Sequence, residues 1–192
     1  MPILLDRTTG TIALNESLDV VAAFEGLFAK LARTPRSLFP EAKREAIDAM
    51  VQANYEALQN GVYRAGFAGS QEAHEEATRD VFGRLDTLEE FLGRQRYLLG
   101  DELTAADWLL FPTLVRFDAI YHVHFKCMMR RLVDYPNVHA YTRELYQHPG
   151  IRETYDLEAT KQHYYRSHPS VHPRGYVPLG PDIDLDAPHG RG

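Results

Sequence analysis

The sequence has 192 residues, of which 44% are hydrophobic, and it carries a net charge of -6. This composition can support a sizeable core, whereas the acidic balance argues against a protein that binds nucleic acid, because such binding needs a basic face. No apolar run approaches the ~20 residues that cross a bilayer, so no membrane association is expected.

The N-terminus lacks the basic and apolar regions of a secretory signal peptide. The single cysteine, Cys127, excludes a disulfide within the chain. Both features are typical of a protein in a reducing compartment, and we expect a cytoplasmic location.

The first 32 residues predict two strands and a helix. Short apolar runs at 2–5 and 11–14 flank the turn sequence Asp6-Arg7-Thr8-Thr9-Gly10, which indicates a β-hairpin. Asn15-Glu16-Ser17 then caps a predicted helix that carries the apolar residues Leu18, Val21, Phe24, Leu27 and Phe28.

Helical periodicity continues from Glu41 to about His168. The last 24 residues are rich in proline and glycine, which excludes a helix there, and we expect disorder from Asp182 onward. The apolar positions expected to share helix faces are Ile47, Met50, Val51, Tyr55 and Leu58; Val81, Leu85, Leu88 and Leu92; and Val138, Tyr141, Leu145 and Tyr146.

A capping box opens one of these helices. Thr104 is followed three residues later by Asp107, whose carboxylate can accept from the Thr104 N–H and favours the positive end of the helix dipole. As a cap alone, Asp107 would contribute about 1–2 kcal/mol. Pro112 lies in what the pattern indicates is the longest helix, where a proline costs roughly 3 kcal/mol unless the helix kinks.

A Leu-Thr-x-x-Asp box before a buried helix resembles the C-terminal domain of glutathione transferases. Four further segments resemble one branch, the glutathionyl-hydroquinone reductases: N-G-V-Y-R-A-G-F-A (60–68), V-R-F-D-A (115–119), H-F-K-C (124–127) and V-H-P-R-G-Y-V-P-L-G-P (171–181).

The resemblance implies a mostly α fold, in which the glutathione-transferase helical bundle follows a ββα remnant of a thioredoxin-like domain. We expect a partial glutathione-binding domain at 1–32, a helical domain at 33–168 and a Pro/Gly-rich tail at 169–192. A two-stranded hairpin is not stable by itself in water, so the chain reads as a fragment, a truncated product or a degenerate family member.

The implied activity is the reduction of glutathionyl-hydroquinones by glutathione, which is the expected co-substrate. By resemblance, Met1, Pro2 and Ile3 form the backbone edge that pairs with glutathione. Glu16 and Ser17 bind its γ-glutamyl part at a helix N-terminus, where free N–H groups and an acidic side chain suit a carboxylate and an ammonium. The alternative interpretation is that Glu16 and Ser17 only cap the helix.

The family's nucleophile is the cysteine of a Cys-Pro-Trp-Ala motif, and the chain contains no such motif. Cys127 matches a family cysteine that is not the nucleophile. We expect Lys126, Arg130 and Arg131 to lower its pKa somewhat, and we expect its side chain to pack in the interior.

By resemblance, Tyr63 and Tyr164 face the active-site cleft, where a phenol can hydrogen-bond the aromatic substrate or donate a proton to the leaving hydroquinone. In a chain with eleven tyrosines, the alternative is that both pack in the core or at its rim. Tyr165 is the residue most easily confused with Tyr164.

His122, His124 and Cys127 are the densest group of possible metal ligands, but positions two apart on a helix do not face one another, so no metal is expected. The expected partners are glutathione, aromatic quinone-type conjugates and a second copy of the chain in a homodimer. The alternative function is a non-catalytic helical module for dimerisation or binding.

Overall fold

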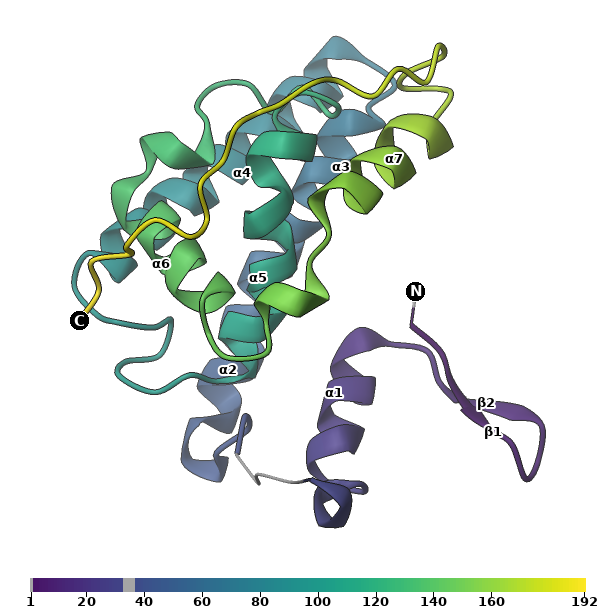
Figure 1. Cartoon of the computed structure of the whole chain (residues 1–192), viewed down its shortest axis with the longest axis vertical. Coiled ribbons are helices and arrows are strands. Elements are labelled where there is room, and N and C mark those ends of the chain that lie inside the picture. Colours follow the sequence, from purple (N-terminus) through teal and green to yellow (C-terminus); the bar gives the residue numbers. More distant parts are fainter. Residues whose placement is uncertain (1, 33–36) are drawn as a thin grey trace.

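The computed structural model describes residues 2–32 and 37–192, and helices make up most of it (Figure 1). Strands β1 (Leu4–Asp6) and β2 (Thr11–Leu14) form an antiparallel hairpin in which Leu5 pairs with Ile12. Within the described ranges the α-helices are α1 (Ser17–Glu25), α2 (Arg44–Asn54), α3 (Gly61–Gly66), α4 (Gln71–Leu92), α5 (Ala105–Arg116), α6 (Pro136–Tyr146) and α7 (Leu157–Ser167).

Single helical turns connect several of these helices. Two are π turns that continue α2 and α5, namely η3 (Tyr55–Gln59) and η4 (Phe117–Tyr121). The 3-10 turns are η1 (Ala29–Leu31), η2 (Glu41–Lys43), η5 (Leu132–Asp134) and η6 (Arg152–Thr154). The ββα unit followed by a helical bundle confirms the fold class that the sequence predicts.

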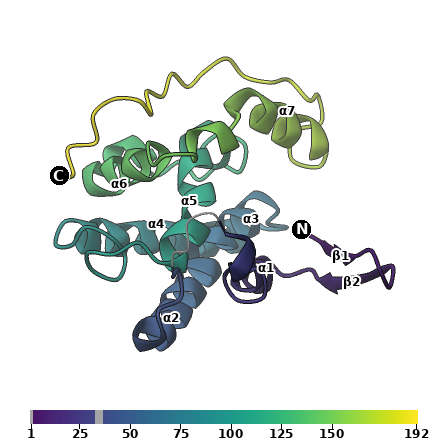
Figure 2. The same ribbon diagram turned by 60° about the horizontal axis from the view of Figure 1, so that its bottom comes forward.

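The hairpin lies apart from the main bundle in Figures 1 and 2, and Figure 1 shows α1 beside it. The Glu25 carboxylate at the end of α1 accepts from the backbone N–H of Leu38 at 2.7 Å and of Phe39 at 3.2 Å. This carboxylate therefore ties the first unit to the start of the second.

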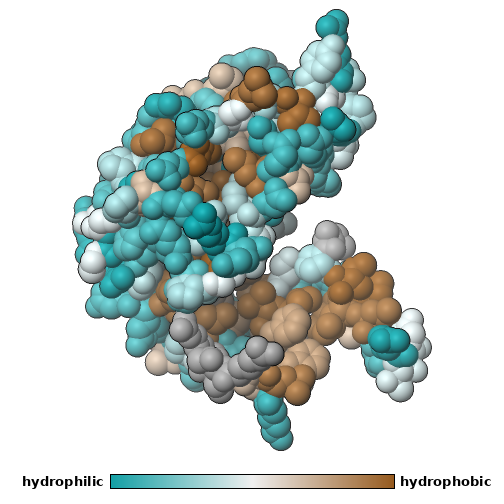
Figure 3. All heavy atoms as spheres, in the orientation of Figure 1, coloured by the Kyte–Doolittle hydropathy of each residue, from teal (hydrophilic) through white to brown (hydrophobic). Residues whose placement is uncertain are grey.

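Large apolar side chains are exposed on α1 and in the turn that follows it. Phe24 is 58% exposed and Leu27 is 81% exposed. Figure 3 shows the resulting apolar surface over α1 and the hairpin. A helix face of this kind needs a covering layer, and the described residues supply none for it.

Helix α4 is the centre of the bundle and packs against α3 and α6, while α5 packs against α2 and α6. Its predicted face is buried throughout, at Val81, Leu85, Leu88 and Leu92. One predicted core position is wrong, because Tyr55 is 54% exposed. It begins the π turn η3, whose wider turn takes it off the face that Ile47 and Leu58 share.

Pro112 does not end its helix. Helix α5 continues through Pro112 to Arg116, and the longest helix of the described chain is instead α4, with 22 residues. Pro112 has no N–H for the Trp108 carbonyl, four residues earlier in the helix. Beside it, the Gln59 side-chain amide donates to the Leu109 carbonyl at 2.7 Å, which adds a contact between η3 and this part of α5.

The segment after Asp182 is bound to the bundle, so the prediction of disorder is wrong. It crosses from the end of α7 over α5 and α6 (Figure 1). Gln147 donates to the Leu185 and Ala187 carbonyls at 2.7 and 2.8 Å. Arg191 pairs with the buried Glu144 at 3.0 Å. Composition excludes a helix here, but it does not exclude an extended segment held by side chains of other elements.

Gly66 allows a close contact that supports the tyrosines described below. A Cβ at Gly66 would overlap the Phe125 ring, whereas a Cβ at Gly83 in α4 would meet nothing within 4 Å. We expect Gly66→Ala to lower the free energy of unfolding by about 1–3 kcal/mol, because Phe125 must move within a packed core. Gly83→Ala is the matched control and should stabilise by up to about 1 kcal/mol. Denaturant midpoints at constant m-value measure both, and equal effects would contradict this account.

Candidate active site

Three phenols form a chain of hydrogen bonds between helices. The hydroxyls of Tyr63 and Tyr164 lie 2.6 Å apart, and those of Tyr121 and Tyr164 lie 3.1 Å apart. Tyr63 is half-buried on α3, Tyr121 is buried at the end of η4, and Tyr164 is buried on α7. Residues 101 positions apart in the sequence are thus in direct contact.

Aromatic packing holds the three phenols in place. The Phe125 ring lies edge-on to the Tyr63 ring at a centroid distance of 5.2 Å, and it stacks on Tyr121 at 5.7 Å. Such pairs are worth ≈ 0.5–1.5 kcal/mol beyond the area they bury. Helix α7 begins with Asp156 as a side-chain cap that accepts from the Ala159 N–H at 2.9 Å.

Tyr164 and Tyr165 make different contacts. The Tyr164 hydroxyl joins the phenol chain, whereas the Tyr165 hydroxyl donates to the Ala119 carbonyl at 3.1 Å. Of the two, Tyr164 is therefore the one that adjoins Tyr63.

Tyr63 and Tyr121 stay protonated at neutral pH. Burial, followed by the hydrogen bond to Tyr164, raises the pKa of Tyr63 to about 12. Burial, followed by the charge of Tyr164, raises the pKa of Tyr121 as well. Neutral phenols can both donate and accept, which suits transfer of a proton along the chain.

Tyr164 also lines a cavity of about 410 Å³ together with Arg116, Thr154, Asp156, Ala159, Thr160 and His163. The Nε of Arg116 is buried and has no hydrogen-bond partner among the described residues. The sequence reasoning missed Arg116 and Tyr121. Arg116 lies in the V-R-F-D-A motif, which offered a signal, whereas Tyr121 was indistinguishable from an ordinary core position.

The predicted glutathione-binding residues lie at one end of the first unit. Met1 is outside the described residues, and Pro2 and Ile3 are exposed at the start of β1. Glu16 is the N-cap of α1, but its side chain makes no capping hydrogen bond, and Ser17 is exposed. The Glu16 side chain therefore accepts no hydrogen bond from the backbone N–H groups at this end of α1.

Cys127 is fully buried, and burial raises its pKa to about 12. The expectation of a lowered pKa is wrong, because burial raises the pKa, and two of the three nearby cations have other partners. Arg130 pairs with Asp86 at 2.6 Å and Arg131 pairs with Asp134 at 2.9 Å. A buried thiol with a raised pKa does not form the thiolate that attacks sulfur, so Cys127 is a packed interior residue.

The histidines pair with other groups. His124 Nε2 lies 3.1 Å from His168 Nδ1, and His122 Nδ1 lies 3.1 Å from the Cys127 carbonyl. Burial, followed by His168, lowers the pKa of His124 to about 4. Among residues 2–32 and 37–192, no group of three or more His, Cys, Asp or Glu side chains has the arrangement of a metal site. In the same ranges, no helix combines the length and the apolar character needed to span a bilayer.

The Thr104–Asp107 capping box is formed, and it is part of a buried network. Asp107 Oδ2 accepts from the Thr104 N–H at 2.8 Å, and Oδ1 accepts from the Leu98 N–H at 2.9 Å and the Tyr141 hydroxyl at 2.8 Å. Asp107 is completely buried. The carboxylate therefore connects α5 to α6 and to the loop before α5, in addition to capping α5.

Comparison with known proteins places these elements in context. The family model described as "Glutathione S-transferase, C-terminal domain" matches residues 71–144. The chain is 44% identical to the glutathionyl-hydroquinone reductase YqjG of Escherichia coli over 191 residues, which is 100% of this chain and 58% of that protein. It is 48% identical to the glutathionyl-hydroquinone reductase PcpF of Sphingobium chlorophenolicum over 94% of this chain and 58% of that protein.

Solved structures match as closely. The glutathione-bound structure of YqjG superposes with a TM-score of 0.96 at 44% identity, over 100% of this chain and 62% of that one. The structure of a Xi class glutathione transferase from Natrialba magadii superposes with a TM-score of 0.97 at 43% identity, over 100% of this chain and 58% of that one. The chain thus spans less than two thirds of the length of these relatives.

Proposed function

We propose that this chain, which belongs to the glutathionyl-hydroquinone reductase branch of the glutathione transferases, provides the phenol half of an active site that reduces glutathionyl-hydroquinones with glutathione. The products are the hydroquinone and glutathione disulfide. The observation that carries this proposal is the chain of hydroxyls from Tyr121 through Tyr164 to Tyr63. Such a chain supplies the proton that the leaving hydroquinone requires.

The proton can be followed through the phenols. The buried Tyr121 hydroxyl is hydrogen-bonded to Tyr164, and it also interacts with the Tyr63 hydroxyl and the Arg116 guanidinium. If Tyr121 donates to Tyr164, then Tyr164 donates to Tyr63, since each hydroxyl has one proton. The Tyr63 O–H is left free to donate away from the chain, and Tyr63 is the least buried of the three.

The reaction balances with this donor. A thiolate attacks the glutathionyl sulfur of the substrate, the bond between that sulfur and the ring carbon breaks, and its electron pair goes to the ring carbon. The ring carbon takes up a proton, which we assign to Tyr63. Glutathione then releases the mixed disulfide as glutathione disulfide, which restores the thiol.

The first unit offers groups that suit glutathione. Glu16 and Ser17 are exposed at the N-terminus of α1, and the Glu16 side chain is not used as a cap. The helix N–H groups can donate to the γ-glutamyl carboxylate, while the Glu16 carboxylate can pair with the γ-glutamyl ammonium. Pro2 and Ile3 are exposed just before β1 and can supply a backbone edge.

The attacking thiol is not among these 192 residues, because Cys127 is buried with a raised pKa. The activity therefore needs a thiol-bearing thioredoxin-like half in addition to this chain. In the experiments below, "the joined protein" means this chain fused behind that half from a xi-class relative.

In the joined protein, Tyr63→Phe should lower kcat and kcat/KM together by ~10-fold or more, because it removes a proton donor that acts in the transition state. Tyr164→Phe should have a similar effect, since it breaks the chain at its middle hydroxyl. Steady-state kinetics with a glutathionyl-hydroquinone measures both.

Tyr165→Phe is the matched control. It removes a hydroxyl that bonds the Ala119 carbonyl, so it should change stability slightly and leave the kinetics unchanged. A larger kinetic effect at Tyr165 than at Tyr164 would show that the wrong tyrosine of the pair has been assigned. Silent changes at both Tyr63 and Tyr164 would reduce the pair to a packing role.

We also propose that the protein works as a homodimer in the cytoplasm. Exposed apolar side chains such as Met128 and Met129, 59% and 60% exposed, are suitable dimer contacts. Sedimentation equilibrium tests this assembly directly, and a monomer at all concentrations would refute it.

A further inference from the structure

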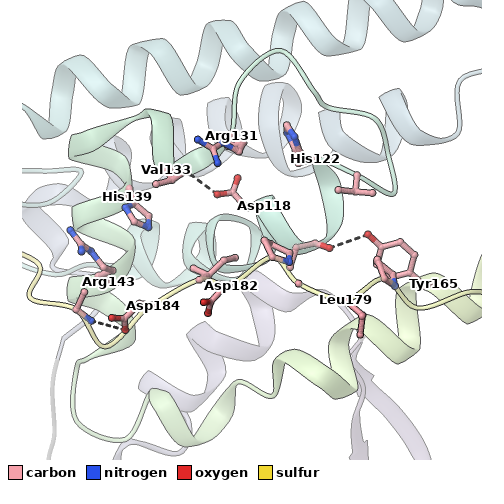
Figure 4. A pocket seen from close by; sticks show the side chains of 17 residues that line it. Asp118, His122, Arg131, Val133, His139, Arg143, Tyr165, Leu179, Asp182 and Asp184 are labelled. Carbon is pink, nitrogen blue, oxygen red and sulfur yellow. Dashed lines mark hydrogen bonds between the residues drawn. The ribbon is translucent and has the colours of Figure 1, made fainter.

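A second cavity, of about 510 Å³, lies between the bundle and the C-terminal segment (Figure 4). We name residues 178–187 the strap, because this segment closes one side of the cavity. The cavity shares no lining residue with the one beside Tyr164. It is therefore distinct from the proposed active site, and its volume lies within the ≈ 300–1,000 Å³ typical of small-molecule sites.

The strap is held in place by the bundle. The Gln147 amide on the end of α6 donates to two strap carbonyls, those of Leu185 and Ala187. Beyond the strap, Arg191 pairs with Glu144 and donates to the Leu92 carbonyl at 3.1 Å. The cavity is thus formed before any ligand arrives, which reduces the entropic cost of binding.

One cation in the cavity wall lacks a partner. Arg143 lies on α6, one turn after His139, and both line the cavity (Figure 4). The Nε of Arg143 is buried and makes no hydrogen bond, and no ion pair among the described residues includes Arg143. Because the Nε is closed off by protein, a ligand carboxylate would pair with the terminal guanidinium nitrogens, which also make no hydrogen bond to the described residues.

Three of the other charged groups of the wall already have partners. Asp118 accepts from the backbone N–H groups of residues 132–133, and Asp184 accepts from those of the strap itself. Arg131 pairs with Asp134. Arg143 is consequently the cation of the wall that remains for a ligand, while the exposed Asp182 of the strap is a carboxylate without a partner among the described residues.

The rest of the cavity suits an apolar body. Val123, Val133 and Ile183 line it, together with Ala119 and the proline rings of the strap. An apolar lining with one fixed polar group selects a ligand that has an apolar body and a single charge.

We propose that this cavity binds a small aromatic carboxylate, with the carboxylate paired to Arg143 and the ring enclosed between the valines and the strap. The assignment does not depend on the reductase activity, since it involves neither the phenols nor glutathione.

The test is isothermal calorimetry on the 192-residue chain with 2-naphthoate and its uncharged analogue 2-naphthamide. We expect the naphthoate to bind at least ~10-fold more tightly than the amide. In Arg143→Gln the two compounds should bind equally weakly, because the charge preference depends on that guanidinium. Arg94→Gln removes a charge that pairs with Glu90 outside the cavity, and it should leave the preference unchanged.

Val123→Trp provides an independent check, because Val123 is 46% exposed at the cavity and can be enlarged without disturbing the core. It should weaken naphthoate binding at least ~10-fold. The proposal would be overturned if 2-naphthoate gave no binding heat up to millimolar concentration. It would also be overturned if 2-naphthoate bound Arg143→Gln and Val123→Trp as tightly as the parent chain.

Discussion

Asp107→Ala should lower the free energy of unfolding by about 3–5 kcal/mol, several times the effect of an exposed cap. The substitution leaves the Thr104 N–H, the Leu98 N–H and the Tyr141 hydroxyl without their acceptor. All three residues are buried, so water does not replace the lost carboxylate. A cap by itself would give about 1–2 kcal/mol.

Asp134→Ala is the matched control for Asp107→Ala. Asp134 also closes a capping box, in which it accepts from the Arg131 N–H at 2.9 Å, but its side chain is 40% exposed. Its removal should cost much less than that of Asp107, because water can solvate the freed groups. Urea midpoints at constant m-value measure both variants. A loss below about 1 kcal/mol for Asp107→Ala would mean that the network contributes nothing beyond a cap.

The chain alone should show no enzyme-like turnover of a glutathionyl-hydroquinone with glutathione. The only thiol is that of Cys127, which is fully buried and has its pKa raised to about 12 by burial. The thiolate is the attacking species, and almost none forms at neutral pH with such a pKa. A coupled assay of glutathione disulfide formation measures this, with the joined protein as the positive control.

Turnover by the isolated chain at the rate of the joined protein would contradict the assigned mechanism. An isolated chain that folds, dimerises and lacks turnover, together with an inactive joined protein, would favour the alternative function, a non-catalytic helical module.

The sequence predicted the fold where local pattern decides it. The face of α4 was evident from its 3.6-residue period, and the hairpin turn from Asp6 and Gly10, whose φ of +70° suits glycine. The position of Tyr55 was missed, because nothing in its local pattern distinguishes a π turn from a continuing α-helix.

Long-range contacts account for the other errors. The segment from Asp182 onward was predicted to be disordered from its composition, but its Arg191 is held by groups that lie 47 and 99 residues earlier in the chain. The Asp107 network was underestimated because Tyr141, 34 residues later, completes it. Such contacts depend on how the helices pack, which no local window contains.

The candidate site was reached through family motifs rather than through residue pattern. Tyr63 and Tyr164 look like ordinary tyrosines of amphipathic helices, and only their motifs single them out. The structure brings their hydroxyls together, while their role in proton transfer stays a prediction. Arg116 and the Arg143 cavity were missed, because a helical arginine is usually solvated and only the packed structure shows that each has a buried Nε.

The central claim is that, in the joined protein, this chain provides the phenols and the thioredoxin-like half provides the attacking thiol. The most direct measurement compares kcat/KM of the joined protein with two variants, one that replaces the donor half's motif cysteine by serine and one that carries Cys127→Ser. We expect the first variant to lose turnover and the second to stay within about 2-fold of the parent, since a packed thiol takes no part in the reaction. Loss of turnover in a folded Cys127→Ser protein, with the motif cysteine dispensable, would contradict the claim.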